Sequence, residues 1–291
     1  MTTANLARGQ RAPQKEHGPR RHRKHRRWSS PATVVSIVVL AIAALWAIAP
    51  GVFAPKDPYT GVDVALLAPS GEYVFGTDAV GRDLFSRVVY GARQSLLGAL
   101  IAVAVGLVLG TLIGLIAGTQ RGWVDTVLMR LVDVLLAIPG ILLSLSIIIV
   151  TGFGSLQAAF AVGMTSVATF ARLARSQVIQ IAGADYVEAA YGSGATQAQV
   201  LLRHVLPNSL TPVLALAALQ FGTAILQLSI LGFLGYGAPP PIPEWGLLIA
   251  EGRDYMATAW WLILLPGLAI VATVMSANHL SQVIQQEGDV K

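Results

Sequence analysis

Six long apolar stretches dominate this 291-residue sequence and restrict what the chain can fold into. A helix needs about 20 predominantly apolar residues to cross the hydrocarbon core of a bilayer. The stretches meet that requirement and cover residues 32–49, 94–118, 126–150, 155–173, 210–234 and 260–278. Only 12% of the residues are charged, whereas soluble domains have ~25%. We therefore predict an all-α integral membrane protein with six transmembrane helices.

The first apolar stretch has a second interpretation, a cleaved secretory signal. Ala47 and Ala49 form a small-residue cleavage pattern after a basic start. Signal cores contain roughly 7–15 apolar residues, however, and this run of 18 is longer. Pro50, directly after Ala49, would also hinder cleavage. We interpret residues 29–50 as an uncleaved first transmembrane helix.

The N-terminal tail, residues 1–28, carries nine Lys/Arg residues and one acidic residue. It accounts for all of the formal net charge of +5, because the rest of the chain is net negative. A basic run beside a first span favours the cytoplasmic side and attracts anionic headgroups. We expect the tail to bind membrane lipids and not nucleic acid.

An even number of spans places both termini on one side of the membrane. With the N-terminus in the cytoplasm, 15 of the 20 Lys/Arg residues lie inside. Residues 51–93 then form a structured extracytoplasmic loop, in which the pattern of 83–90 predicts a short interfacial helix. Residues 94–282 form the membrane core, and 283–291 form a cytoplasmic C-terminal tail.

Features inside the spans bear on packing and bending. Small residues recur at every fourth position of the second span, at 98, 102, 106, 110, 114 and 118. Such a ridge lets another helix backbone approach closely. Pro139-Gly140 predicts a kink in the third span. We interpret Asp133 as an acid near the cytoplasmic interface rather than as a proton relay.

Several kinds of chemistry have no sequence basis here. The chain has no cysteine and no G-x-x-x-x-G-K-[ST] motif for phosphate binding. Its spans are poor in ionisable residues, whereas ion-coupled carriers place such residues near the middle of the membrane. We predict no catalytic, cofactor or metal site, and we expect the energy for any transport to come from other subunits.

A polar insert separates the fourth and fifth spans, and its central part covers residues 175–209. Positions 176–191 have a helical pattern, which Gly192-Ser193-Gly194 interrupts. Thr196 and Gln199 form a capping-box pair for a second helix, which we expect to stop at Leu206-Pro207. A short helix of this kind suits insertion into another protein's groove. On spacing alone, an ordinary amphipathic surface helix explains the pattern equally well.

The insert also resembles a known motif. Glu188-Ala189-Ala190, Gly194 and Leu206-Pro207 match the EAA motif of permease subunits of binding-protein-dependent ABC importers. Other segments resemble the C-type permease of the dipeptide/oligopeptide/nickel family: Phe75-Gly76-Thr77-Asp78, Gly81-Arg82-Asp83, Ser86-Arg87, Tyr90-Gly91-Ala92-Arg93, Asp133 with Ala137-Ile138-Pro139, and the glycine-rich run 231–237. Pro240-Pro241, Trp245-Gly246, Gly252-Arg253 and Pro266-Gly267 extend the match, which spans about residues 30–280.

The resemblance implies a MetI-like ABC importer permease fold in a bacterial inner (plasma) membrane. Such a chain is not an enzyme, and it forms half of a translocation pathway for dipeptides or oligopeptides. Its expected partners are a B-type permease subunit in a heterodimer, two ABC ATPase subunits or one fused ATPase, and an extracytoplasmic peptide-binding protein. ATP and Mg²⁺ would bind to the ATPase subunits.

The resemblance also assigns residues. The ATPase-coupling set is Glu188, Ala189, Ala190, Gly194, Arg203, His204, Leu206 and Pro207. Glu188 would orient a coupling helix through polar contacts, and Gly194 would form its corner. Arg203 and His204 would lie near the ATPase or the inner headgroups. Asp133, Pro139 and Gly140 would serve gating or structural roles.

Two alternatives remain open from the sequence. The same family imports nickel complexes and other small solutes, and nothing in the spans separates these from peptides. A chain of a different class, a membrane anchor or scaffold for an ATPase, would carry the same insert. A self-powered channel or carrier is disfavoured by the scarcity of charged residues within the spans.

Overall fold

The computed structural model describes residues 30–61, 63–120 and 122–288, so the basic tail lies outside the described part. Within these ranges the chain is helical, and its only β-type pairing is an isolated bridge between Thr77 and Asp83. The helices are α1 (Pro31–Ile48), α2 (Pro50–Phe53), α3 (Leu84–Gln120), α4 (Gly122–Ala137), α5 (Gly140–Thr151), α6 (Ser155–Ala182), α7 (Asp185–Gly192), α8 (Gln197–Val200), the π-helical η2 (Leu201–Val205), α9 (Leu206–Phe233), α10 (Trp245–Gly252), the 3₁₀ turn η3 (Arg253–Tyr255) and α11 (Trp261–Gly288).

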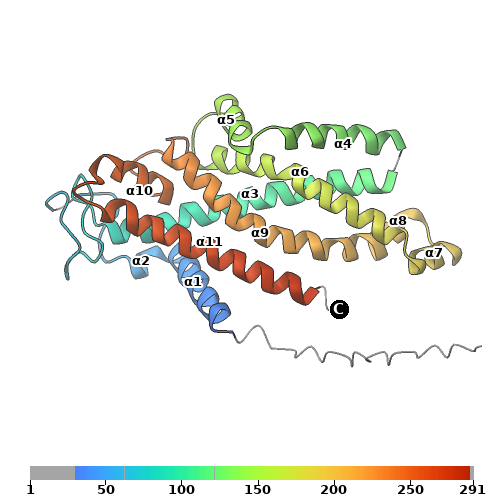
Figure 1. The fold of residues 1–291 in the computed structure, drawn as a ribbon, viewed down its shortest axis with the longest axis horizontal. Helices are drawn as coiled ribbons and strands as arrows, with labels where there is room; N and C mark the ends of the chain where they lie inside the picture. Colours follow the sequence, from blue (N-terminus) through green and yellow to red (C-terminus); the bar gives the residue numbers. More distant parts are fainter. Residues whose placement is uncertain (1–29, 62, 121, 289–291) are drawn as a thin grey trace, which may run out of the picture.

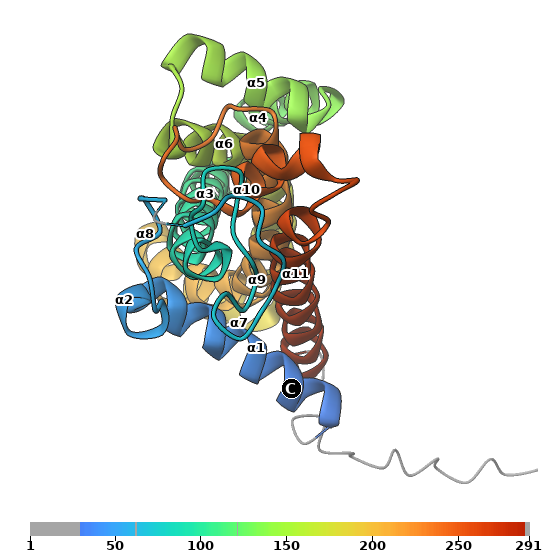
Figure 2. The ribbon, with the colours of Figure 1, turned by 90° about the vertical axis from the view of Figure 1, so that its left-hand side faces the viewer.

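Five long apolar helices in the described part can cross a membrane: α1, α3, α6, the continuous 197–233 helix and α11. The pair α4 and α5 passes the same test only as a unit, which gives up to six spans. The prediction of six apolar spans in an all-α chain is therefore consistent with the structure. Figure 1 shows α10 and the loop between α2 and α3 at one end of the molecule, and α7 and α8 at the other. Figure 2 looks onto the α10 end.

The small-residue ridge of α3 is a helix–helix seam, as predicted. All six of its members are buried, and most of them face α6. A Cβ atom added at Gly110 would lie 2.5 Å from Phe170 Cβ and 2.5 Å from the Val167 carbonyl oxygen. Real Cβ atoms do not approach other atoms so closely, so only glycine fits at this crossing. The seam is consistent with small-residue packing in membranes, where close backbone contact replaces the hydrophobic driving force.

The third span is broken rather than kinked. The axes of α4 and α5 differ by 98° across Ile138 and Pro139. A proline lacks the N–H for a helical bond and disfavours helical geometry in the residue before it. Pro139 instead stands at the N-cap of α5, and Gly140 opens the new helix. The sequence located the bend correctly but underestimated its size.

Several predicted helix boundaries are wrong. Residues 84–90 are the first turns of α3 rather than a separate interfacial helix, so the predicted loop boundary at residue 93 falls inside α3. Leu84, Val88 and Val89 are buried in the protein and not directed at lipid. Likewise α6 continues through residues 176–182, and the helix predicted over 176–191 divides at Gly183-Ala184. A helix can continue beyond the membrane surface into polar residues. Helix ends predicted from where an apolar stretch stops are therefore misplaced for α3 and α6.

Candidate functional site

The elbow, which we define as residues 183–205, connects α6 to α9 at the end of the molecule opposite α10 (Figure 1). It contains α7, a glycine turn, α8 and η2. A cavity of about 480 Å³ lies beside it, lined by the ends of α3 and α6 and by α7, α8 and η2. The predicted coupling residues 188–207 therefore come together in one compact structure at the ends of the spans.

Four buried valines fasten the elbow to the spans. Val187 of α7 and Val200 of α8 pack with Val205 of η2 and Val178 of α6, and each is at most 3% exposed. Burying an aliphatic side chain of this size contributes about 1.5–3 kcal/mol. The cluster thus holds α7 and α8 to α6 and to η2, which continues directly into α9.

The side of α7 that faces away from the valine cluster is exposed. Glu188 and Ala189 are exposed, and Ala190 is half-buried against the valines. Asp185 and Glu188 lie in the first turn of α7, where negative charge is stabilised by the unpaired N–H groups of the helix end. Among the described residues, the Glu188 carboxylate has no hydrogen-bond or ion-pair partner. Any polar contact through which it orients the helix must come from outside this part of the chain.

Gly194 forms the corner after α7, as its place in the motif implies. Its φ of +89° lies in the left-handed region that favours glycine. The N–H of Gly194 donates to the Tyr191 carbonyl and that of Ala195 to the Ala190 carbonyl, a Schellman motif that satisfies the last carbonyls of α7. No atom lies within 4 Å of a Cβ built at Gly194. The position is therefore restricted by backbone conformation and not by space.

The capping box predicted at the start of the second elbow helix is present. Thr196 Oγ1 accepts from the Gln199 N–H, and Gln199 Oε1 accepts from the Thr196 N–H. The predicted stop at Leu206-Pro207 is wrong, because α8, η2 and α9 form one continuous helix. Pro207 therefore lies inside a continuous helix, where it removes one backbone N–H donor, and the π-helical η2 ends two residues before it. The Leu206 N–H reaches back five residues to Leu201, and this π-type turn carries the chain past the proline.

Arg203 and His204 have different surroundings. Arg203 is exposed, whereas His204 is half-buried with its ring 6.3 Å from that of Tyr186 in α7. The Asn208 amide donates to the His204 carbonyl oxygen at 2.6 Å and to the Tyr186 hydroxyl at 3.5 Å. His204 therefore contacts α7, and of the two residues Arg203 is the more exposed.

Two salt bridges connect α4 to α6, and Asp133 forms one of them. Its carboxylate lies 2.7 Å from Arg172, and both side chains are more than half exposed. Asp125, eight residues before Asp133 on α4, receives two hydrogen bonds from Arg175 of α6. Asp133 thus has an ion-pair partner on the neighbouring helix α6, so it is not an isolated acid.

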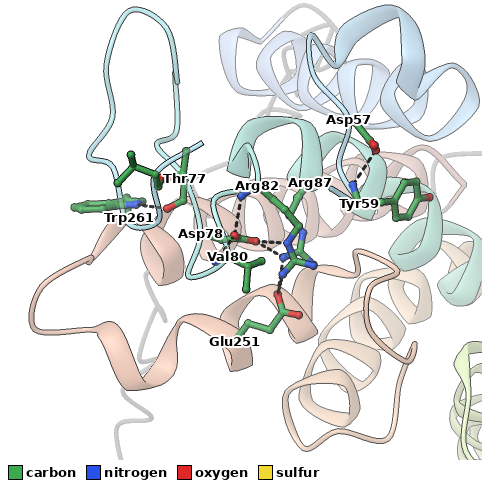
Figure 3. A network of polar contacts seen from close by, with 10 residues as sticks. Asp57, Tyr59, Thr77, Asp78, Val80, Arg82, Arg87, Glu251 and Trp261 are labelled. Carbon is green, nitrogen blue, oxygen red and sulfur yellow. Dashed lines mark hydrogen bonds and ion pairs between the residues drawn. The ribbon is translucent and has the colours of Figure 1, made fainter. Parts of the chain in front are cut away.

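A second polar cluster lies at the α10 end and was given no role from the sequence. The guanidinium of Arg87, in α3, is fully buried and donates to Asp78 Oδ2 at 2.6 Å and to Glu251 Oε2 at 2.7 Å (Figure 3). Arg82 donates to the same Asp78 oxygen at 2.7 Å. The cluster ties the loop before α3 and the first turns of α3 to α10, across 164 residues of sequence.

Asp78 is the centre of this cluster. Burial would raise its pKa, but the Arg82 backbone N–H and the Arg87 charge, with smaller contributions, together hold the pKa below its ordinary value. Two Arg87 nitrogens, Nε and Nη2, have no acceptor among the described residues. A cavity of about 300 Å³ lined by both arginines, Asp78 and Glu251 adjoins them. Such a cavity is large enough for water molecules to complete the hydrogen bonding.

Glu244 is a further buried acid that the sequence did not single out. It caps α10 by accepting from the Gly246 and Leu247 N–H groups, and it packs against Gly232 and Gly237. Burial raises the pKa of Glu244 to about 7, although these two backbone bonds and Ser95 oppose the shift. The sequence carried no strong signal for this role, because the residues preferred at N-caps are Ser, Thr, Asp and Asn and not Glu.

Curated relatives cover nearly the whole chain. It is 39% identical over 259 residues to the dipeptide transport system permease protein DppC of Alkalihalophilus pseudofirmus, which covers 89% of this chain and 85% of the relative. It is 38% identical to the probable D,D-dipeptide transport system permease protein DdpC of Escherichia coli, over 90% of this chain and 88% of the relative. A glutathione transport system permease protein, GsiD of Escherichia coli, is 38% identical over 97% of this chain and 91% of the relative.

Solved structures show the same fold at much lower identity. An inward-facing MetNI methionine ABC transporter chain superposes with a TM-score of 0.55 and 17% identity, covering 68% of this chain and 96% of its own length. An amino acid ABC transporter chain superposes with a TM-score of 0.56 and 16% identity, covering 70% of this chain and 95% of its own length. The family model for the binding-protein-dependent transport system inner membrane component matches residues 110–286. The chain therefore belongs to the family of inner membrane components of binding-protein-dependent transport systems.

Proposed function

We propose that this chain is the C-type permease of an ATP-driven importer and forms half of a translocation pathway for dipeptides or oligopeptides. The observation that carries the proposal is similarity of 38–39% over most of the chain to permeases named for dipeptides and glutathione. A B-type permease would supply the other half of the pathway, and an extracytoplasmic binding protein would deliver the peptide. The chain itself would bind no ATP, Mg²⁺ or other cofactor.

In this proposal the elbow is the coupling element. Its exposed face, with Glu188 and Ala189, would dock into a cleft of an ATPase subunit, and Arg203 would contribute a charge nearby. The buried valines would transmit the motion of the ATPase to α6 and α9, because Val178 belongs to α6 and Val205 to η2, which continues directly into α9. Rigid-body movement of spans around a pathway is an established form of switching.

The opposite end of the molecule would meet the binding protein. The elbow and the basic tail would then lie in the cytoplasm, together with the C-terminus, and the α10 end would lie outside. The buried cluster of Arg87, Asp78 and Glu251 would keep the loop before α3 and α10 together as one docking platform. This arrangement follows the excess of Lys/Arg on the N-terminal side.

Uptake by whole cells tests the proposal. Cells that lack this chain but retain the other subunits should lose uptake of a labelled dipeptide, and the full-length chain should restore it. A methionine or sugar importer measured in the same cells serves as the control for general membrane damage. Undiminished dipeptide uptake in the deletion strain, with no other peptide permease present, would contradict the proposal.

A further inference from the structure

A cavity of about 290 Å³ lies among the spans, between α3, the α4–α5 corner, α6 and α9. That volume is near the lower end of the ~300–1,000 Å³ typical of ligand pockets. The residues with polar side chains that line it are Thr165, Ser166, Thr169, Gln220, Thr223 and Gln227. Among the described residues that line it, none carries a charge.

The polar residues form two facing stripes. Thr165 and Thr169 are four residues apart on α6, and Gln220, Thr223 and Gln227 follow a spacing of three and four on α9. Residues spaced in this way share one face of a helix. Polar side chains within spans normally face the protein interior or a water-filled cavity, and all five are half-buried.

The hydroxyl groups of Thr165, Ser166 and Thr223 donate to backbone carbonyls of their own helices, but the amides have unused capacity. Thr165 Oγ1 donates to the Val162 carbonyl at 2.7 Å, a local bond common for threonine in helices. It also lies 3.3 Å from Gln227 Oε1, across the interface of α6 and α9. In the described part of the chain, that contact is the only side-chain hydrogen bond of Gln227, and Gln220 makes none. A carboxamide can donate two hydrogen bonds and accept two.

The break between α4 and α5 adjoins the same stripe. A Cβ atom added at Gly140 would lie 3.6 Å from Gln227 Nε2 and 3.9 Å from Thr165 Cβ. The backbone corner therefore borders the space in front of the two side chains, and a change in the angle between α4 and α5 would alter that space.

We propose that Gln220 and Gln227, flanked by Thr165, Thr169 and Thr223, contact the main-chain amides of the peptide in transit. A peptide group has one donor and one acceptor, and a carboxamide complements both. An uncharged lining contributes no preference for the charge of the cargo side chains, which suits a pathway for peptides of varied sequence. The inference rests on the proposed function and extends it to the cargo and its contacts.

The absence of cysteine from the chain makes a direct test possible. Gln220→Cys and Gln227→Cys are introduced singly into the complete transporter, with Leu226→Cys as the matched control. Leu226 adjoins Gln227 on α9 but does not line the cavity. A charged thiol reagent added to membranes should label the two glutamine positions at least about tenfold faster than the control, because thiols react as thiolates, which require water. Dipeptide supplied with its binding protein and ATP should slow that labelling.

Labelling of Gln227→Cys no faster than of Leu226→Cys, in a transporter that still imports dipeptide, would overturn the inference and leave the proposed function intact. Absence of dipeptide import by the unmodified transporter would instead overturn the proposed function. Gln227→Glu gives an independent readout, since its shape is conserved. It should shift the ratio of basic to acidic dipeptide uptake by about tenfold in favour of basic peptides. An unchanged ratio would count against contact with the cargo.

Discussion

Arg87 Nη1 lies 2.7 Å from Glu251 Oε2 and joins the start of α3 to the end of α10. The arginine is fully buried, whereas the glutamate side chain is 26% exposed. Removing one partner from a buried pair leaves an uncompensated charge, which costs more than the pair itself contributes. The contact is therefore a structural link on which the geometry of the α10 end depends.

The Arg87→Leu variant should be destabilised by about 1–3 kcal/mol, because Asp78 and Glu251 keep Arg82 as a partner but lose the hydrogen bonds of the fully buried cation. Thermal unfolding in detergent measures the effect. The matched control is Arg253→Leu, since Arg253 is 62% exposed and, in the part of the chain that the structure describes, pairs only with its neighbour Asp254. An exposed pair contributes about 0–1 kcal/mol, so the control should melt close to wild type. Equal melting temperatures for both variants would contradict a structural role for the cluster.

The seam between α3 and α6 should not tolerate a methyl group. Gly110→Ala would bring Cβ to 2.5 Å from Phe170 Cβ, and overpacking of this kind costs about 1–3 kcal/mol. Gly267→Ala on α11 is the matched control, because no atom lies within 4 Å of a Cβ built there. It should be neutral or slightly stabilising, since alanine favours helices by up to about 1 kcal/mol over glycine. The same thermal unfolding assay compares the two variants. Equal stability of Gly110→Ala and Gly267→Ala would contradict close backbone packing of α3 on α6 at Gly110.

Stability should depend on pH through Glu244. Its pKa in the folded chain is raised to about 7, above the ordinary value of 4.5. The folded state therefore binds the proton more tightly, so the stabilisation is full below the ordinary pKa and is lost as the pH rises through the folded pKa. Unfolding experiments between about pH 5 and pH 8 should show stability falling by up to about 3 kcal/mol.

Glu244→Gln should flatten this profile, because a carboxamide does not titrate in the range. The variant loses one of two cap acceptors, so its stability at low pH should fall below that of wild type. Asp78 does not obscure the result. Its lowered pKa confines its contribution to a loss at pH values below the ordinary one of 3.8. Parallel pH profiles for wild type and Glu244→Gln would exclude Glu244 as the titrating group.

At Gly194 the structure predicts which residues are tolerated. Since only the positive φ restricts the position, Gly194→Asn should retain most uptake activity, whereas Gly194→Val should lose it. Asparagine adopts the left-handed region readily, and β-branched residues do not. Uptake of a labelled dipeptide, normalised to the amount of chain in the membrane, is the measurement. Equal loss in both variants would indicate that the space around Gly194 is filled by a partner.

Local patterns predicted much of this molecule. The capping box of Thr196 and Gln199, the turn at Gly194 and the ridge through Gly110 depend on residues within a few positions of one another, so the sequence reveals them. The extension of α6 beyond the apolar stretch and the passage of the chain through Pro207 could not be predicted in the same way. The extended part of α6 packs through Val178 against valines of α7, α8 and η2, and a π-helical turn precedes Pro207.

The clusters at the α10 end show the limit more clearly. Arg87 is one of the five Lys/Arg residues that charge counting places outside the cytoplasm. The sequence does not reveal that it is buried, because its partner Glu251 lies 164 residues away. Likewise Thr165 and Gln227 are 62 residues apart, and only the packing of α6 on α9 brings them into contact. Charge counting describes the side of the membrane, but it cannot distinguish a solvated residue from a fully buried one.

The central claim is that the exposed face of α7 is where the chain meets an ATPase. Ala189→Cys, the only cysteine in its chain, should form a short thiol-to-amine cross-link to an ATPase subunit in the assembled transporter. Val74→Cys, 57% exposed in the loop before α3, is the control and should not cross-link to that subunit. An ATPase cross-link at position 189 and none at 74 is the result predicted here. No ATPase cross-link at 189, or equal cross-linking at both positions, would contradict the account.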